Sequence, residues 1–230
     1  MNKSLWIFDY DQTLMPSYIS NIIINKSIIN SNDINKIIII LINMMIIINK
    51  IINNINGEII ILTASLEPWI NTSLKHAETI IYNNKQLIDY NMIKEYVIYY
   101  DFNKINKILN TDSVFTMFFE NTLKNNIYYV HNIERENGSN FERHDKKTSL
   151  HFLIHKYNKY NNIIILGDSY ENERKYAIEI AKNNKNKIIK FIQFYNTVDN
   201  LIKIHEQHLL FNNLNIIQNT HYNAIFDIDE

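Results

Sequence analysis

Three short apolar runs in this chain each end abruptly in a polar cluster. The run "LWIF" is followed by "DYDQT", "EIIIL" is followed by "TAS", and "NIIIL" is followed by "GDS". Apolar runs of this length are typical of strands that are buried on both faces of a parallel sheet. Because the carboxyl ends of parallel strands lie at one edge of the sheet, we expect the three polar clusters to meet there.

Helical segments alternate with the apolar runs, which is the pattern of an α/β fold with a mainly parallel sheet and right-handed crossovers. We expect Ser65 to cap the helix that begins near Pro68. The expected strands are Lys3–Phe8, Glu58–Leu62, Glu95–Tyr100, "NIIIL" and Ile188–Phe194, and the expected helices are Ser31–Asn54, Pro68–Tyr82, a segment from Lys146, Tyr170–Lys182 and Val198–Leu210.

The segment from 101 to 145 has a weaker pattern than the rest of the chain. Within it, "SVFTMFF" and "NIYYVHNI" are expected to form the strands of a small hairpin. A length of 230 residues suits one domain with an embellishment. We therefore expect a single domain over 1–210, with 101–145 as a small hairpin or cap insertion, and a tail over 211–230.

Composition and charge exclude several classes of protein. The net charge of -1 offers no electrostatic case for nucleic acid or an anionic membrane as the main partner, and the absence of cysteine excludes disulfides and thiolate metal sites. The longest apolar run, Ile37 to Ile48, is too short to span a bilayer and contains Asn43, so we expect a buried core helix. Asp9 and Asp11 interrupt the only early apolar run, which argues against a signal segment and predicts a cytoplasmic protein.

The cluster "DYDQT" carries the clearest chemical signal. Asp9 and Asp11 flank Tyr10, so in an extended backbone their side chains point the same way. Together with Asp168 from another strand end, they would supply the oxygen ligands that Mg²⁺ prefers. A cation at that edge neutralises a phosphate group, which allows one carboxylate to attack phosphorus while the other transfers protons.

Four motifs occur in order along the chain. The first is "WIFDYDQTL", an apolar strand followed by D-x-D-x-T, and the second is "IIILT", an apolar strand that ends in Thr63. The third is a lysine at the start of a helix, for which Lys146 and Lys147 both qualify, and the fourth is "IIILGDSYENE". This series resembles the haloacid dehalogenase-like (HAD) hydrolases, most of which are phosphatases, and the resemblance covers roughly Lys3 to Phe194. It implies a Rossmann-like three-layer α/β/α sandwich with a small or absent cap.

The resemblance also implies a role for each matched residue. Asp9 would be the nucleophile that forms an aspartyl-phosphate, and Asp11 would protonate the leaving group and later activate water. Thr63 would hydrogen-bond the phosphoryl group, and Lys146 or Lys147 would offset its charge. The implied Mg²⁺ ligands are Asp9, the backbone carbonyl of Asp11, Asp168, and Asn172 or Glu173.

The fourth motif departs from the commonest form of the family. Asn172 stands where many members carry a second aspartate, and Glu173 fits a variant with one more spacer residue. The main expectation is hydrolysis of a phosphomonoester, either a small molecule or a macromolecule. A nucleic-acid-end 3′-phosphatase and a catalytically silent HAD-like binding module are the alternatives, and Asn172 is the main support for the second.

Overall fold

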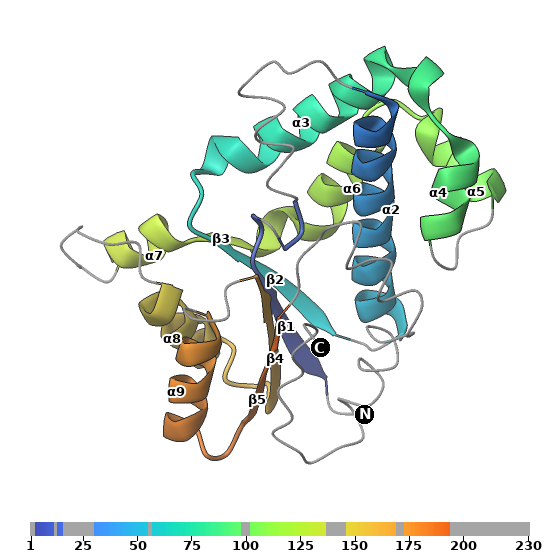
Figure 1. The fold of residues 1–230 in the computed structure, drawn as a ribbon. Coiled ribbons are helices and arrows are strands. Elements are labelled where there is room, and N and C mark those ends of the chain that lie inside the picture. Colours follow the sequence, from blue (N-terminus) through green and yellow to red (C-terminus); the bar gives the residue numbers. More distant parts are fainter. Residues whose placement is uncertain are drawn as a thin grey trace.

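A sheet of five parallel strands lies at the centre of the computed structural model, which describes residues 3–11, 13–15, 30–54, 57–97, 102–136, 146–168 and 173–193 (Figure 1). The order of the strands is β3-β2-β1-β4-β5, and every neighbouring pair is parallel. This confirms the predicted α/β fold with a parallel sheet. The strands are β1 (Ser4–Phe8), β2 (Glu58–Thr63), β3 (Ile127–Tyr129), β4 (Asn162–Gly167) and β5 (Ile188–Gln193).

The three strands that carry the polar clusters are adjacent. β1 is central, and its last residue, Phe8, pairs with Ile61 of β2 on one side and with Leu166 of β4 on the other. The backbone N–H of Asp9 donates to the carbonyl oxygen of Leu166 at 2.8 Å, so the pairing of β1 with β4 continues one residue further. The polar clusters after β1, β2 and β4 therefore share one edge of the sheet, as the sequence predicts.

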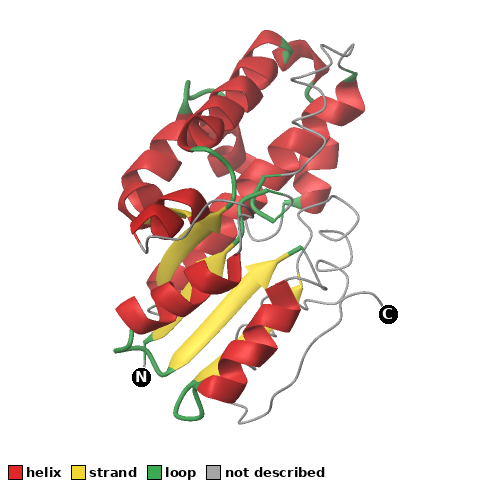
Figure 2. Ribbon diagram, turned by 90° about the vertical axis from the view of Figure 1, so that its left-hand side faces the viewer, coloured by secondary structure: helices red, strands yellow, loops and turns green. Residues whose placement is uncertain are grey.

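Helices cover both faces of the sheet. Trp6 and Phe8 of β1 belong to a core that β1 shares with α2 (Ser31–Asn54), whereas Leu5 and Ile7 belong to a second core on the opposite face. Side chains of successive strand residues point to opposite faces, so the four apolar residues of β1 contribute to both cores. In Figure 2, the left-hand side of Figure 1 faces the viewer, and the helices of the second core lie in front of the sheet. These helices are α7 (Val130–Glu136), α8 (Lys146–Lys156) and α9 (Lys175–Asn183).

Helix α2 confirms the predicted core helix. Asn43 in its buried middle donates its amide N–H to the carbonyl oxygen of Ile39 at 2.8 Å, which satisfies a polar group inside the core. Among the described residues, Ser31–Asn53 is long and apolar enough to cross a membrane, but 88% of its apolar window is buried within the protein. A core helix of a globular protein passes the same test, and a cytoplasmic location stays a prediction.

Gly57, between α2 and β2, lies where no side chain would fit. A Cβ atom at this position would lie 2.8 Å from Cδ1 of Trp6 and 2.9 Å from Cγ2 of Ile51, which is closer than carbon atoms pack. The glycine therefore lets the chain turn from α2 into the sheet directly over the indole ring of Trp6.

The predicted strand at Glu95–Tyr100 is wrong where the structure describes it. Helix α4 spans Tyr90–Tyr96 instead, and residues 98–100 lie outside the described residues. The side chain of Asp89 accepts hydrogen bonds from the backbone N–H groups of Asn91 and Met92, which caps this helix. Ile93 and Val97 are buried at helical spacing, so packing outweighs the β propensity of "EYVIYY".

The predicted hairpin within 101–145 is also wrong. "SVFTMFF" forms helix α6 (Val114–Leu123), and β3 within "NIYYVHNI" pairs in parallel with β2 rather than with a hairpin partner. Phe115 and Phe119 are buried one helical turn apart, so their packing against the core favours a helix here. The remaining elements between β2 and α8 are α3 (Glu67–Asn83), η1 (Lys85–Leu87), α5 (Phe102–Leu109), η2 (Lys124–Asn126) and α7 (Val130–Glu136).

Three further predictions lie partly or wholly outside the described residues. The helix expected at Tyr170–Lys182 is described as α9 from Lys175, and residues 169–172 are not described. The helix expected at Val198–Leu210 and the tail over 211–230 are also outside the described part of the chain.

Candidate functional site

Three carboxylates meet at the edge of the sheet where β1 and β4 end. Asp9 follows β1, Asp168 follows β4, and Glu173 lies just before α9. One oxygen from each carboxylate lies within 4.8 Å of the others. Asp9 is 8% exposed and Glu173 is 3% exposed, so two of the three acids are largely removed from water.

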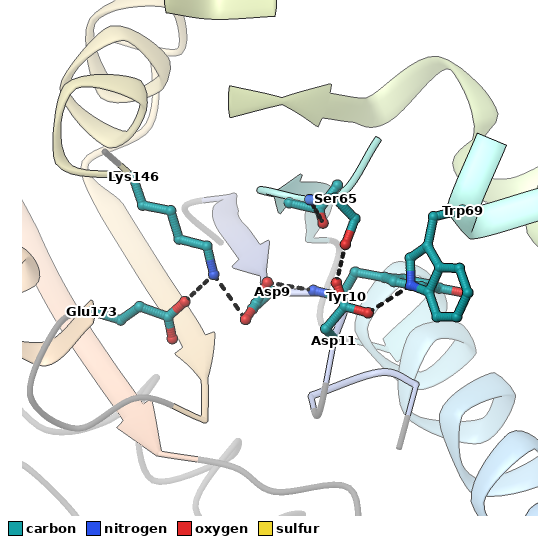
Figure 3. Close-up of polar contacts among 8 residues, drawn as sticks. Asp9, Tyr10, Asp11, Ser65, Trp69, Lys146 and Glu173 are labelled. Atoms are coloured by element: carbon teal, nitrogen blue, oxygen red, sulfur yellow. Dashed lines mark hydrogen bonds and ion pairs between the residues drawn. The ribbon is translucent and has the colours of Figure 1, made fainter. Parts of the chain in front are cut away.

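Lys146, the first residue of α8, pairs with two of these acids (Figure 3). Its Nζ lies 2.8 Å from Oδ2 of Asp9 and 2.5 Å from Oε1 of Glu173. The neighbouring Lys147 instead forms an ion pair with Glu179 of α9 at 2.6 Å, in which both side chains are more than a third exposed. Of the two lysines that qualified in the sequence, the structure brings only Lys146 to the carboxylates.

Burial and the neighbouring charges both shift the pKa values of the cluster. Burial raises the pKa of Asp9 well above its ordinary value; attraction to Lys146 opposes this, and repulsion from Glu173 and Asp168 adds to it. Burial alone would lower the pKa of Lys146, but attraction to Asp9 and Glu173 outweighs burial and raises it. Lys146 is therefore a cation at neutral pH, and its ammonium is shared by Asp9 and Glu173.

The donor set fits a divalent cation such as Mg²⁺. Oε2 of Glu173 is buried and has no hydrogen-bond partner among the described residues. Such an atom is costly unless a donor or a metal reaches it. A Cβ atom on Gly167 would overlap this same carboxylate, so the glycine leaves room for Glu173 to point into the cluster. Carboxylate oxygens are the ligands that Mg²⁺ prefers, and Asp9, Asp168 and Glu173 supply them.

The carboxylate of Asp11 has a separate set of partners (Figure 3). The hydroxyl of Ser65 donates to Oδ2 of Asp11, and Nε1 of Trp69 donates to Oδ1 at 2.8 Å. The prediction that Ser65 caps the following helix is wrong, because α3 has Leu66 at its N-cap and no side-chain cap hydrogen bond. The hydroxyl of Ser65 instead lies at the carboxylate of Asp11, where it makes a charge-assisted hydrogen bond.

Tyr10 lies between the two aspartates and points into the core. Its hydroxyl lies 2.7 Å from Oγ of Ser73, and its ring meets Phe119 edge-on with centroids 5.9 Å apart. Burial raises the pKa of the Tyr10 phenol, so it stays protonated. The backbone N–H of Tyr10 donates to Oδ1 of Asp9 at 2.7 Å, which fixes the second oxygen of that carboxylate.

Thr63 is the fully buried last residue of β2. Its hydroxyl oxygen accepts a hydrogen bond from the backbone N–H of Ser65 at 3.0 Å. Because this contact uses the oxygen as an acceptor, the hydroxyl hydrogen remains available for donation to a ligand. The predicted role of Thr63 as a phosphate ligand is compatible with that arrangement and stays a prediction.

Two functional candidates were missed in the sequence, Ser65 and Trp69. Both follow β2 closely, so their proximity to the predicted site edge was the available signal. Asn172 lies outside the described residues. The structure brings together Asp9, Lys146, Asp168 and Glu173, places Asp11 against Ser65 and Trp69, and leaves Lys147 paired elsewhere.

Substitution of Glu173 by Gln should weaken Mg²⁺ binding to the folded protein. A cation that binds only the native state stabilises wild type by about 2.7 kcal/mol at one hundred times its dissociation constant. We expect Glu173→Gln to lose most of this gain, measured as the difference in Tm between Mg²⁺ and EDTA. Glu179→Gln, which changes an exposed acid on α9, is the control and should keep the full shift. An equal Mg²⁺ shift in both variants would contradict a cation site at Glu173.

Three comparisons with known proteins found no match. No protein-family model, no curated protein and no solved structure matches this chain. Folds with parallel sheets host many unrelated activities, so the side chains at the sheet edge are the basis for a proposal of function.

Proposed function

We propose that this protein is a Mg²⁺-dependent HAD-like phosphatase that hydrolyses a phosphomonoester through an aspartyl-phosphate on Asp9. The observation that carries this proposal is the buried cluster in which Asp9 and Glu173 share Lys146 beside Asp168. A buried acid that contacts a lysine at the end of a central strand supports the proposal that Asp9 is the nucleophile. The order of the four motifs along the chain supports the same assignment.

In the first half of the reaction, the phosphoryl group moves from the ester oxygen of the substrate to a carboxylate oxygen of Asp9. A carboxylate oxygen of Asp9 attacks phosphorus, and the bond from phosphorus to the ester oxygen breaks. The electron pair of that bond remains on the leaving oxygen, which takes a proton from Asp11. Lys146 favours the ionised form of Asp9 that this attack requires, because its ammonium lies 2.8 Å from Oδ2 of Asp9.

In the second half, water releases the phosphate. Asp11, now a carboxylate, takes a proton from water as the water oxygen attacks phosphorus, and the bond from phosphorus to Asp9 breaks. Inorganic phosphate leaves, Asp9 is again a free carboxylate, and Asp11 has regained its proton. The hydroxyl of Thr63 and the ammonium of Lys146 would interact with the phosphoryl oxygens.

The proposed ligands of Mg²⁺ are Asp9, Asp168, Glu173 and the backbone carbonyl of Asp11. When bound, the cation would offset the charge of the phosphate group that otherwise repels the attacking carboxylate. The unpartnered Oε2 of Glu173 supports its inclusion in this set. Asn172, the other candidate from the sequence, is outside the described residues.

We further propose that the cap is small or absent. Of the helices between β2 and β3, α3 and α4 contact α2, and α6 contacts both α2 and α3. Buried residues of these helices share one core with Trp6 and Phe8. Packing of this kind joins these helices to α2 in one core and argues against a separate cap unit above the site. Small esters and phosphorylated macromolecules both remain candidate substrates.

The test is an assay of hydrolysis across a panel of phosphate esters. The panel contains p-nitrophenyl phosphate, alkyl phosphates, phosphopeptides and an oligonucleotide with a 3′-phosphate, each with Mg²⁺ and with EDTA. We expect phosphate release that requires Mg²⁺, and an aspartyl-phosphate on Asp9 that hydroxylamine converts to a hydroxamate detectable by mass spectrometry. No release from any ester would contradict the phosphatase and favour the silent binding module. Release from the oligonucleotide alone would favour the nucleic-acid-end phosphatase.

A further inference from the structure

Trp69 makes a contact with Asp11 that the four motifs do not explain. Its indole Nε1 donates to Oδ1 of Asp11 at 2.8 Å, and the indole is only partly buried. An indole N–H donates and never accepts, so the oxygen that faces it must be an acceptor. While this contact holds, Oδ1 of Asp11 is occupied as the acceptor of the indole N–H.

The other oxygen of Asp11 faces a different kind of partner. Oδ2 contacts the hydroxyl of Ser65, which can either donate or accept a hydrogen bond. Ser65 is therefore compatible with both the protonated and the ionised carboxylate. We propose that Trp69 is a positioning residue that holds Asp11 so that Oδ2 alone gives and takes the proton. This inference rests on the proposed function, in which Asp11 is the acid and base.

Helix α3 is built to hold this orientation. Trp69 and Ser73 are four residues apart, on one face of α3, and they contact Asp11 and Tyr10 respectively. The hydroxyl of Ser73 also donates to the carbonyl oxygen of Ile70 at 3.0 Å. The backbone N–H of Trp69 donates to the carbonyl oxygen of Leu66 at 2.9 Å. Two neighbouring residues after β1 are thus fixed by one helix, so Asp11 cannot turn without losing the hydrogen bond to Trp69.

The consequence concerns the leaving group of the substrate. An alkoxide is a poor leaving group and needs the proton from Asp11, whereas p-nitrophenolate leaves without one. The value of kcat/KM includes the step in which the leaving group departs, provided that this step is irreversible. Loss of the correct orientation of Asp11 should therefore lower kcat/KM for alkyl phosphates much more than for p-nitrophenyl phosphate.

Trp69→Phe tests this directly, because it removes the N–H and keeps an aromatic ring. We expect kcat/KM to fall about tenfold or more with an alkyl phosphate and less than about threefold with p-nitrophenyl phosphate, since general acid catalysis contributes roughly 10²–10⁴-fold. Trp6→Phe is the matched control, because Trp6 is the other tryptophan and its Nε1 has no hydrogen-bond partner among the described residues. In this control variant, kcat/KM should change by the same factor for both substrates.

A second measurement does not depend on activity. In a Trp6→Phe background Trp69 is the only indole, and we expect Asp11→Asn to shift its fluorescence emission. Unchanged emission would overturn the inference. An equal loss of kcat/KM for both substrates in Trp69→Phe would overturn it too, while leaving the phosphatase proposal intact. A wild-type protein that hydrolyses no ester would overturn the phosphatase proposal and the positioning role with it.

Discussion

Asp9→Asn is expected to abolish phosphatase turnover while leaving the fold intact. An amide is not a nucleophile at phosphorus, so no aspartyl-phosphate can form, and removal of a catalytic nucleophile typically costs at least about 10⁴-fold in kcat. Asn keeps the shape of Asp and retains an oxygen that can accept from the backbone N–H of Tyr10. Initial rates with Mg²⁺ and p-nitrophenyl phosphate measure the loss. Asp112→Asn, at an exposed position, is the control and should retain the wild-type rate.

The same variant should not be less stable than wild type in EDTA at neutral pH. Burial raises the pKa of Asp9 in the folded state, so the ionised carboxylate costs folding free energy that the neutral amide does not. Relative to the ionised form, protonated Asp9 contributes to the stability of the folded wild type. This stability is fully present below the unfolded pKa of 3.8 and is lost as pH rises through the raised folded pKa. The stability of Asp9→Asn relative to wild type should therefore increase with pH across that window.

Two results would contradict this account of Asp9. Residual activity of Asp9→Asn close to wild type would remove the nucleophile from the proposal. A variant that is clearly less stable than wild type in EDTA at neutral pH would instead show that the ion pair with Lys146 outweighs the cost of burial. Urea denaturation at several pH values measures the second quantity.

Lys146→Met is expected to reduce both stability and activity, whereas Lys147→Met is expected to change little. Lys146 is 18% exposed and pairs with two buried acids, and removal of one partner from a buried pair costs about 3–5 kcal/mol. Loss of its ammonium from the phosphoryl group should lower kcat by roughly 10²–10³-fold. The pair of Lys147 with Glu179 is exposed, so solvent screens it and its loss should matter little. Urea denaturation in EDTA and initial rates with Mg²⁺ distinguish the two variants.

Added Mg²⁺ sharpens the comparison of the two lysines. A divalent cation at Asp9, Asp168 and Glu173 would offset the carboxylate charge that Lys146 no longer balances, so it should restore part of the stability of Lys146→Met. Lys147→Met should gain no more from Mg²⁺ than wild type does. Equal losses in the two lysine variants would mean that the ion pairs of Lys146 do not govern the site.

The strand ends could be predicted from the sequence because they depend on local signals. A short apolar run that stops at polar residues is a buried strand followed by a site edge, whichever helices surround it. β1, β2, β4 and β5 therefore match their predicted ranges closely. The described part of 95–100 and the segment at 113–119 were mispredicted as strands, because isoleucine, valine and aromatic residues favour strands locally. Tertiary packing of Ile93, Phe115 and Phe119 makes their surroundings helical where the structure describes them.

The sequence by itself determined which strand ends carry acids and that Asp9, Asp11 and Asp168 share one edge of the sheet. It did not distinguish Lys146 from Lys147, because both begin the same helix and differ only by a rotation of about 100° per residue. Only the packing of α8 turns Lys146 toward Asp9 and Lys147 toward Glu179. The partners of Asp11 were likewise decided by the tertiary structure. Ser65 and Trp69 lie 54 and 58 residues from Asp11 in the chain. The pairing of β2 with β1 and the position of α3 after β2 bring them to its two oxygens.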